Sequence, residues 1–257
     1  MPETALLVGA VPTAPQTITV NAAPPAQLSA GTYYLRHPDP SLSLIDAVEQ
    51  LMDDEGVLGA DVSVRQNLRV RISSLANFQL TLSGRLQRLL GFEGPLAGGQ
   101  SIYDAPRISP LLWAPGYRAT PTSRAGKAGY KVPHTTRHKS DDGSRQETQF
   151  FGEEVWQELE WDFIPSELLS VADGEHDGGT FEGFYEEVLK YGRPFHYYES
   201  IVTLPTTNAI GWTSSFGPYQ LRDEIDPVWY RRIRSNTDDI SGGVGLELHL
   251  VEEYSNA

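Results

Sequence analysis

The sequence predicts an α+β fold that is rich in strands, and three patterns carry that prediction. From Val62 to Ile72 the apolar residues occupy even positions, a period of two that is typical of a strand with one buried face. The same alternation returns over 154–163 and 244–251. Over 180–191 the aromatic and apolar residues recur at spacings of three and four, which indicates a helix with one apolar face.

We expect two small units joined by an extended basic arm. Residues 1–30, rich in Ala, Pro and Thr, are expected to form an extended N-terminal arm with at most a short edge strand at 18–20. An α+β unit follows over 31–116. Residues 117–150 have no periodicity and are too long for an ordinary loop, so they are expected to be a basic flexible arm or linker. Residues 151–257 are expected to form a β-rich, sandwich-like domain with one helix.

Within the first unit, a strand is expected at 31–35, followed by a helix that Ser41 or Ser43 caps and Gly56 ends. The helix has an apolar stripe at Leu42, Ile45, Val48, Leu51 and Met52. The alternating segment at 62–72 is either one long strand or a hairpin with an odd-length turn, because a two-residue turn would mix its faces.

A second strand at 78–82 is expected to pair with the alternating segment, and a short helix at 86–92 to stop at Gly91. Between 94 and 116, glycine and proline are expected to prevent long regular structure.

The second unit is expected to open on the strand at 154–163, one face of which is largely acidic. The helix at 180–191 should end at Gly192, with Pro194 preventing its continuation. A strand at 195–204 follows, because that segment is rich in aromatic and β-branched residues. Residues 206–218 are expected to be a long turn, with further strands at 228–233 and 244–251.

Composition restricts the possible functions. The chain has 257 residues, a formal charge of −14 and no cysteine. Because nucleic-acid affinity comes mainly from neutralising phosphates, this charge disfavours nucleic acid as the main partner. Without cysteine there is no disulfide, thiol nucleophile or thiolate metal site. No apolar run approaches 18 residues, and the N-terminus lacks the features of a signal peptide, so we expect neither a membrane helix nor a leader.

Charge is distributed unevenly along the chain. Basic residues concentrate in the arm, and acidic residues dominate 153–187. A self-assembling subunit could lay such an arm on a neighbour, although a solvated loop is the alternative. Arg65, Arg69 and Arg71 share a predicted sheet face that either contacts an acidic partner or is solvated, and Trp113 docks on another subunit or on its own domain. The predicted interface residues are Arg65, Arg69, Arg71, Trp113, Arg118, Arg124, Lys127, Lys131, Arg137, Lys139 and Arg145.

Motifs for catalysis are missing from the sequence. It contains no phosphate-binding glycine loop and no GxSxG elbow, so we predict no catalytic residue and no cofactor. His134 and His138 are four residues apart, but they have no third ligand and do not lie in a predicted helix. Tyr197, Tyr198 and Trp212 either stack against a sugar or belong to the core.

Two groups of segments resemble virion proteins of tailed phages. The segments GTYYL, SLIDAVEQLM, VRQNLRVRISS, FQLTL and LQRLLGF, within 31–92, are similar to a module found in such proteins. The segments LEWDFIP, FEGFYEEVLKYG, GRPF and GLELHLVEEY, within 154–254, resemble distal tail and tail-tip proteins. The resemblance implies a β-rich subunit of a homo-oligomeric ring without catalytic residues. The long basic arm departs from that pattern, so the resemblance does not determine the position of the protein within the virion.

The leading hypothesis is therefore a non-enzymatic virion subunit of the tail tip or baseplate, which joins the tail tube to hub or adhesion proteins. Such a protein would be made in the host cytoplasm, would be located in the virion and would have other virion proteins as partners. The first alternative is a capsid decoration or head–tail connector protein. The second is a carbohydrate-binding module or glycan-active enzyme.

Overall fold

The structure is α+β and rich in strands, as the sequence predicts. It is a computed structural model. It describes residues 6–21, 23–96, 98–114, 124–131, 135–139, 145–149, 154–164, 168–169, 179–203, 210–221 and 244–252.

Short helices and strands follow one another along the described residues. The first part contains β1 (Leu6–Thr13), β2 (Gln16–Val20), β3 (Ala26–Leu28), β4 (Gly31–Tyr34), η1 (Pro40–Leu42), α1 (Leu44–Asp54), β5 (Asp61–Val64), β6 (Arg69–Phe78), β7 (Leu80–Leu82), α2 (Gly84–Leu89), β8 (Gln100–Ile108) and β9 (Leu112–Trp113). The second part contains β10 (Arg124–Lys131), β11 (Thr135–Lys139), β12 (Arg145–Gln149), β13 (Glu154–Ile164), α3 (Phe181–Glu187), η3 (Leu189–Tyr191), β14 (Phe195–Thr203), β15 (Ile210–Leu221) and β16 (Val244–Glu252).

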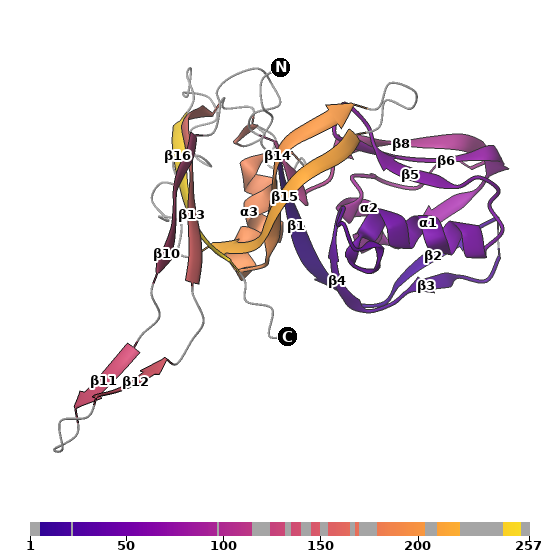
Figure 1. The fold of residues 1–257 in the computed structure, drawn as a ribbon. Coiled ribbons are helices and arrows are strands. Elements are labelled where there is room, and N and C mark those ends of the chain that lie inside the picture. The colour runs from indigo at the N-terminus through magenta and orange to yellow at the C-terminus, as the bar shows by residue number, and fades with distance from the viewer. Residues whose placement is uncertain are drawn as a thin grey trace.

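The largest sheet has eight strands drawn from both ends of the chain. Its order is β10-β13-β16-β15-β14-β1-β4, and β9 also pairs with β1. Two three-stranded sheets, β3-β2-β7 and β5-β6-β8, belong to the first half. In Figure 1, α1 and α2 lie between these two smaller sheets, while α3 lies beside the large sheet.

Strand β1 is the element that joins the two halves. Its first four residues pair antiparallel with β14, and its last four pair with β4. The Ala10 N–H donates to the Pro194 carbonyl at 2.9 Å, and the Gly9 N–H donates to the Leu111 carbonyl at 2.8 Å. One apolar core therefore contains buried residues of both halves.

The prediction of an extended arm over residues 1–30 is wrong for β1. Leu6, Leu7, Val8, Ala10 and Val11 are fully buried. A strand that is covered on both faces is a continuous apolar run without alternation, so the period-two test cannot detect it. The short strand expected at 18–20 does form, as β2, but it is the central strand of its sheet and not an edge.

Helix α1 forms as predicted. The Ser43 side chain accepts the Asp46 N–H at 3.5 Å, which caps the first turn. Leu44, Ile45, Val48 and Met52 are buried on the inner face of the helix.

The alternating segment at 62–72 is a hairpin with an odd-length turn. Val64 pairs with Val70, and the Arg65 N–H donates to the Arg69 carbonyl at 2.8 Å across a three-residue loop. Leu68 closes this loop with φ +64°, the left-handed conformation that such loops need at that position. The other alternative, one long strand, is therefore wrong.

Helix α3 and strand β14 also form as predicted. The Thr180 side chain accepts the Gly183 N–H at 3.2 Å, and Gly192 adopts φ +59° where the helical segment closes. The strands predicted at 154–163 and 244–251 are β13 and β16. The strand predicted at 228–233 lies outside the described residues.

Several predicted pairings and loops are wrong because these strands pair in ways that the apolar pattern does not show. Strand β7 pairs with β2 and not with β6. The segment 94–116, expected to lack long regular structure, contains the nine-residue strand β8 at the edge of its sheet. Pro106 lies in β8 where the register with β6 shifts, and such a position tolerates proline. The expected turn at 206–218 is largely β15, and Gly217 and Pro218 lie at a register shift opposite β14.

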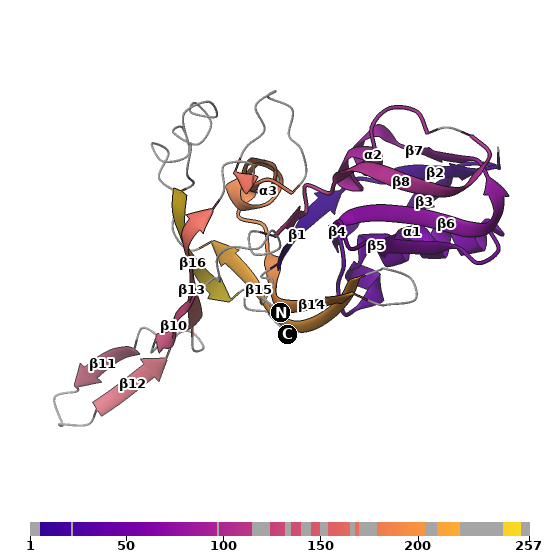
Figure 2. The ribbon, with the colours of Figure 1, turned by 90° about the horizontal axis from the view of Figure 1, so that it is seen from above.

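The basic arm contains three strands, so the prediction that 117–150 lacks regular structure is wrong for its described parts. Strand β10 pairs with β13, while β11 and β12 form a separate two-stranded sheet. A two-stranded ribbon requires no buried face, so its sequence need not alternate. Both views show this hairpin projecting beyond β10 and β13, away from the rest of the molecule (Figures 1 and 2).

Gly9→Ala tests the packing of β1 against the second half. A Cβ at Gly9 would lie 2.2 Å from Cγ2 of Val188, a buried β-branched side chain that cannot move aside. We expect a loss of about 1–3 kcal/mol in the free energy of unfolding, measured by denaturant titration. In the double variant with Gly9→Ala, Val188→Ala should restore part of the stability that Gly9→Ala removes. Gly84→Ala is the control, because nothing lies within 4 Å of its added Cβ. Equal stabilities of the Gly9→Ala variant and wild type would contradict the packing.

Candidate functional site

The three arginines predicted at an interface lie at the β5–β6 hairpin. Arg71 forms a two-point ion pair with Asp104 of β8, with Nε at 2.5 Å and Nη2 at 2.7 Å from the carboxylate oxygens. This side-chain hydrogen bond raises the pKa of Arg71. Arg69 is exposed and Arg65 is half-buried. Arg71 is therefore neutralised within the chain, while Arg69 remains a surface cation.

Trp113 is part of the core, so its prediction as an interface residue is wrong. Its side chain is 0% exposed, and its Nε1 donates to the Leu168 carbonyl at 3.1 Å. Its ring meets the edge of Phe181 at a centroid distance of 4.9 Å. The alternative, in which this tryptophan packs on its own domain, is the one observed, and Trp113 thereby anchors β9 against α3.

The remaining predicted interface residues lie in the arm. Arg124, Lys127 and Lys131 belong to β10, Arg137 and Lys139 to β11, and Arg145 to β12. Arg118 lies outside the described residues, as does His134, while His138 belongs to β11.

The aromatic pair considered as a sugar platform is buried. Tyr197 is 4% and Tyr198 is 2% exposed, so neither ring offers a face to a sugar, and the core alternative holds for both. Trp212 belongs to β15.

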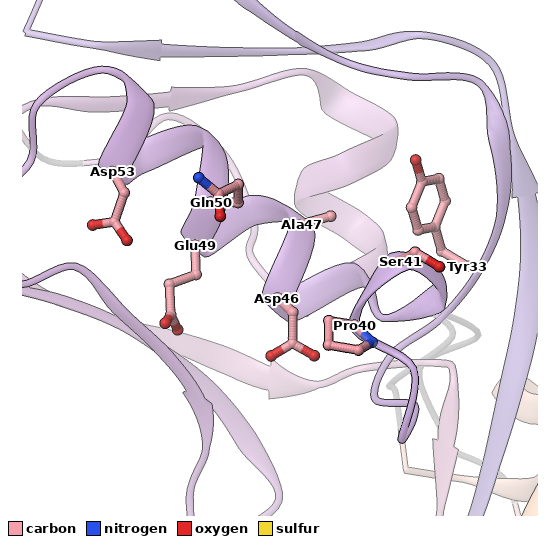
Figure 3. Close-up of a pocket in the computed structure, with 8 residues that line it drawn as sticks. All are labelled: Tyr33, Pro40, Ser41, Asp46, Ala47, Glu49, Gln50 and Asp53. Carbon is pink, nitrogen blue, oxygen red and sulfur yellow. The ribbon is translucent and has the colours of Figure 1, made fainter.

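An acidic hollow runs along the outer side of α1. It has a volume of about 410 Å³ and is lined by Tyr33, Pro40, Ser41, Asp46, Ala47, Glu49, Gln50 and Asp53. Figure 3 shows Asp46, Glu49 and Asp53 projecting from the same side of the helix. Their spacings of three and four residues place them one turn apart along one face, beside the buried stripe.

Glu49 is the most constrained carboxylate of the hollow. Its Oε2 accepts the Val62 backbone N–H at 2.9 Å, which ties α1 to β5. Partial burial raises the pKa of Glu49, the Val62 hydrogen bond opposes that shift, and the negative charges of Asp61, Asp46 and Asp53 add to it. The hollow therefore holds more negative charge than its surroundings neutralise.

The charges along α1 are balanced only near its start. Arg36 forms an ion pair with Asp46. Asp53 and Asp54 are exposed at the C-terminal end of the helix, and its last turn contains no basic residue. The helix dipole is negative at that end and disfavours acidic residues there, so an external cation would be attracted to this face.

A cationic cluster occurs where α2 meets α3. The Glu187 carboxylate lies 2.6 Å from Arg88 Nη2, and 3.9 Å from both Arg85 Nη2 and Arg193 Nη1. The Arg193 guanidinium lies over the Tyr191 ring, 4.5 Å from its centroid, and partial burial lowers the pKa of Arg193. Lys190 pairs with Glu186 at 2.7 Å and lies 5.9 Å from the centroid of the same ring.

Three rings meet between the two halves of the chain. Tyr34, His37 and His196 lie with each pair of centroids 4.9 Å apart. His196 is buried at the start of β14, and Tyr34 is buried at the end of β4. This contact packs one half of the chain on the other.

Among the residues that the structure describes, no group of three or more His, Asp or Glu side chains is arranged to hold a metal ion. Within the same residues, no helix has the length and apolar composition needed to cross a bilayer. Comparison with protein-family models, curated proteins and solved structures finds no match to this chain.

The two charged surfaces were missed by the sequence analysis, for different reasons. The acidic row on α1 is visible in the sequence, since Asp46, Glu49 and Asp53 repeat at helical spacing beside the apolar stripe that was recognised. The cationic cluster is not visible, because Arg85 and Arg88 meet Glu187 across about a hundred residues of sequence.

Glu49→Gln tests the electrostatics of the hollow. The amide oxygen can still accept the Val62 N–H, while the partly buried charge is removed. Folding raises the pKa of Glu49, so at pH values above that pKa the ionised carboxylate destabilises the folded state. At pH values below the pKa of Glu49 in the unfolded chain, the carboxyl is protonated in both states and has no such effect. We expect Glu49→Gln to be more stable than wild type at pH 7, by about 0.5 kcal/mol after solvent screening. The difference in the free energy of unfolding should shrink as the pH falls below the pKa of Glu49 in the folded state, and should vanish below its pKa in the unfolded chain.

Denaturant titration at several pH values measures this effect. Glu49→Ala is the matched variant: it also removes the charge, but it leaves the Val62 N–H without its acceptor and should be less stable than Glu49→Gln. A Glu49→Gln variant that is less stable than wild type at pH 7 would show that the charge is stabilising.

Proposed function

We propose that this chain is a non-enzymatic structural subunit of a tailed-phage virion, at the tail tip or distal tail. In this proposal it assembles into a ring and connects the tail tube to hub or adhesion proteins. The observation that supports an assembling subunit best is the projecting β11–β12 hairpin. The resemblance of the 31–92 segments to a module of phage virion proteins supports a virion subunit, and that of the 154–254 segments to distal tail and tail-tip proteins supports the position at the tail.

The hairpin has features of an element that is completed by a neighbour. It pairs in one continuous register, from Thr135 opposite Gln149 to Lys139 opposite Arg145. In the described part of the chain it is a two-stranded sheet, and such sheets are marginally stable alone in water. Each strand has an outer edge of backbone N–H and C=O groups that can pair with a strand of another chain.

The two strands of the hairpin are basic, while the sequence that joins them adds Asp141 and Asp142. The segments TTRHK and RQETQ contain Arg137, Lys139 and Arg145 against the single acid Glu147. The chain as a whole carries a formal charge of −14, so another copy is an electrostatically suitable partner.

Removal of the hairpin tests its role in assembly. Lys131 and Glu154 are direct partners across β10 and β13, so a two-residue Asn-Gly turn can join them in place of residues 132–153. We expect wild type to form closed rings by light scattering and negative-stain imaging. The shortened variant should keep the wild-type unfolding transition but remain monomeric. A variant that forms the same rings as wild type would contradict this role.

The position of the chain within the virion needs a separate measurement. Gold-labelled antibodies against the chain should mark the tail end of intact virions of the encoding phage. Labelling of the capsid surface or neck would instead support the alternative of a capsid decoration or head–tail connector protein. Purified virions that lack the chain would contradict both stations.

A further inference from the structure

The cationic cluster presents a positive outer surface on a chain that is strongly negative. We call Arg85, Arg88, Lys190, Tyr191 and Arg193 the Tyr191 surface. Arg88 and Lys190 reach outward, with 56% and 46% of their side chains exposed, and Arg85 is 37% exposed, whereas Arg193 is 17% exposed. The carboxylates beneath them are largely covered, with Glu187 13% and Glu186 20% exposed. A partner that approaches this surface therefore meets positive charge first.

The composition of the Tyr191 surface is typical of a protein interface. Arginine and tyrosine are enriched in interface cores and among the residues that contribute most to binding. The Tyr191 ring is 60% exposed, and the Arg193 guanidinium lies over it. Glu187 holds Arg88 and approaches Arg85 and Arg193, so these long side chains are already ordered and lose less entropy on binding.

The acidic face of α1 is complementary to this surface. Asp46, Glu49 and Asp53 line a hollow of ligand size on this face, and Asp54 follows in the last turn of the helix. Arg36 pairs with Asp46 near the start of the helix, whereas Asp53 and Asp54 lie at an end without a basic residue. A guanidinium or ammonium group from a partner would reduce the repulsion among these carboxylates and with the helix dipole.

The two surfaces lie on opposite sides of the first half of the molecule. In Figure 2, α2 lies at one edge of this half, next to α3, and α1 lies at the other edge. One molecule therefore cannot present both surfaces to the same face of a single partner. A contact between them repeats from copy to copy in the same direction, and such head-to-tail contacts generate rings when the rotation closes.

We propose that the Tyr191 surface of one copy docks on the acidic face of α1 of the next copy. The inference rests on the proposed ring, and it names the contact that builds the ring. Arg88 and Lys190 approach Asp53 and Asp54, and Tyr191 is covered at the centre of the contact. The interaction is electrostatic, so assembly weakens as the salt concentration rises.

Charge reversal on each side tests the contact. The cationic-side variant carries Arg88→Glu and Lys190→Glu, and the acidic-side variant carries Asp53→Lys and Asp54→Lys. Each variant alone places like charges at every contact, so we expect self-association at least roughly 100-fold weaker than wild type. Light scattering across a concentration series measures it. A chain with all four substitutions restores opposite charges and should form rings again.

A mixture of the two variants provides a second rescue. In equimolar amounts they alternate around the ring, so only even-membered rings should form. The matched control compares Arg88→Glu alone with Thr81→Glu plus Gln100→Glu, which makes the same change in net charge at two exposed positions of β7 and β8. Rings should persist with the Thr81→Glu and Gln100→Glu pair. An equal loss there, or the absence of both rescues, would overturn the proposed contact.

The failure of this inference is distinguishable from the failure of the proposed function. If the cationic-side and acidic-side variants form rings as wild type does, while the hairpin replacement does not, the chain assembles through another contact and the proposed function stands. A wild-type chain that remains monomeric at every concentration and at low salt would overturn the contact and the ring together.

Discussion

The pairing of β1 with β14 is the interaction on which the rest of the structure depends. It brings residues 6–9 next to residues 195–198, so the large sheet contains strands from both ends of the chain. Gly9 is needed there because Val188 occupies the space of a side chain. The same arrangement places β9 beside β1 and lets Trp113 reach α3. The two halves therefore fold around one core, and neither half has a complete core without the other.

The charged surfaces follow from this arrangement. Once β14 is paired with β1, the helical segment before β14 lies next to α2, and Glu187 comes within reach of Arg85, Arg88 and Arg193. The cationic cluster is thus a product of tertiary structure. The acidic face of α1, by contrast, belongs to one helix and would exist wherever that helix is placed.

The sequence predicted those elements whose signal is local. Helices α1 and α3 have caps and an apolar face within a dozen residues, and β13 and β16 alternate along their length. The missed elements lack a signal of this kind in their own segment. Strand β1 is buried without alternation, β8 and β15 contain prolines at register shifts, and the arm strands pair without an apolar pattern. For the candidate site, the acidic row was present in the sequence, whereas the cluster around Glu187 required knowledge of the fold.

Helix α1 shows why the charged faces indicate more than stability. Its last turn contains Asp53 and Asp54 without a basic residue, and its dipole disfavours that arrangement by about 0.3–1 kcal/mol for each charge. The helix tolerates this cost because Leu44, Ile45, Val48 and Met52 are buried beneath it, and each such side chain contributes about 1.5–3 kcal/mol. Lysine at these two positions would stabilise α1 more than aspartate does. The stability of α1 therefore does not account for the acidic row, which leaves this face available for the contact proposed above.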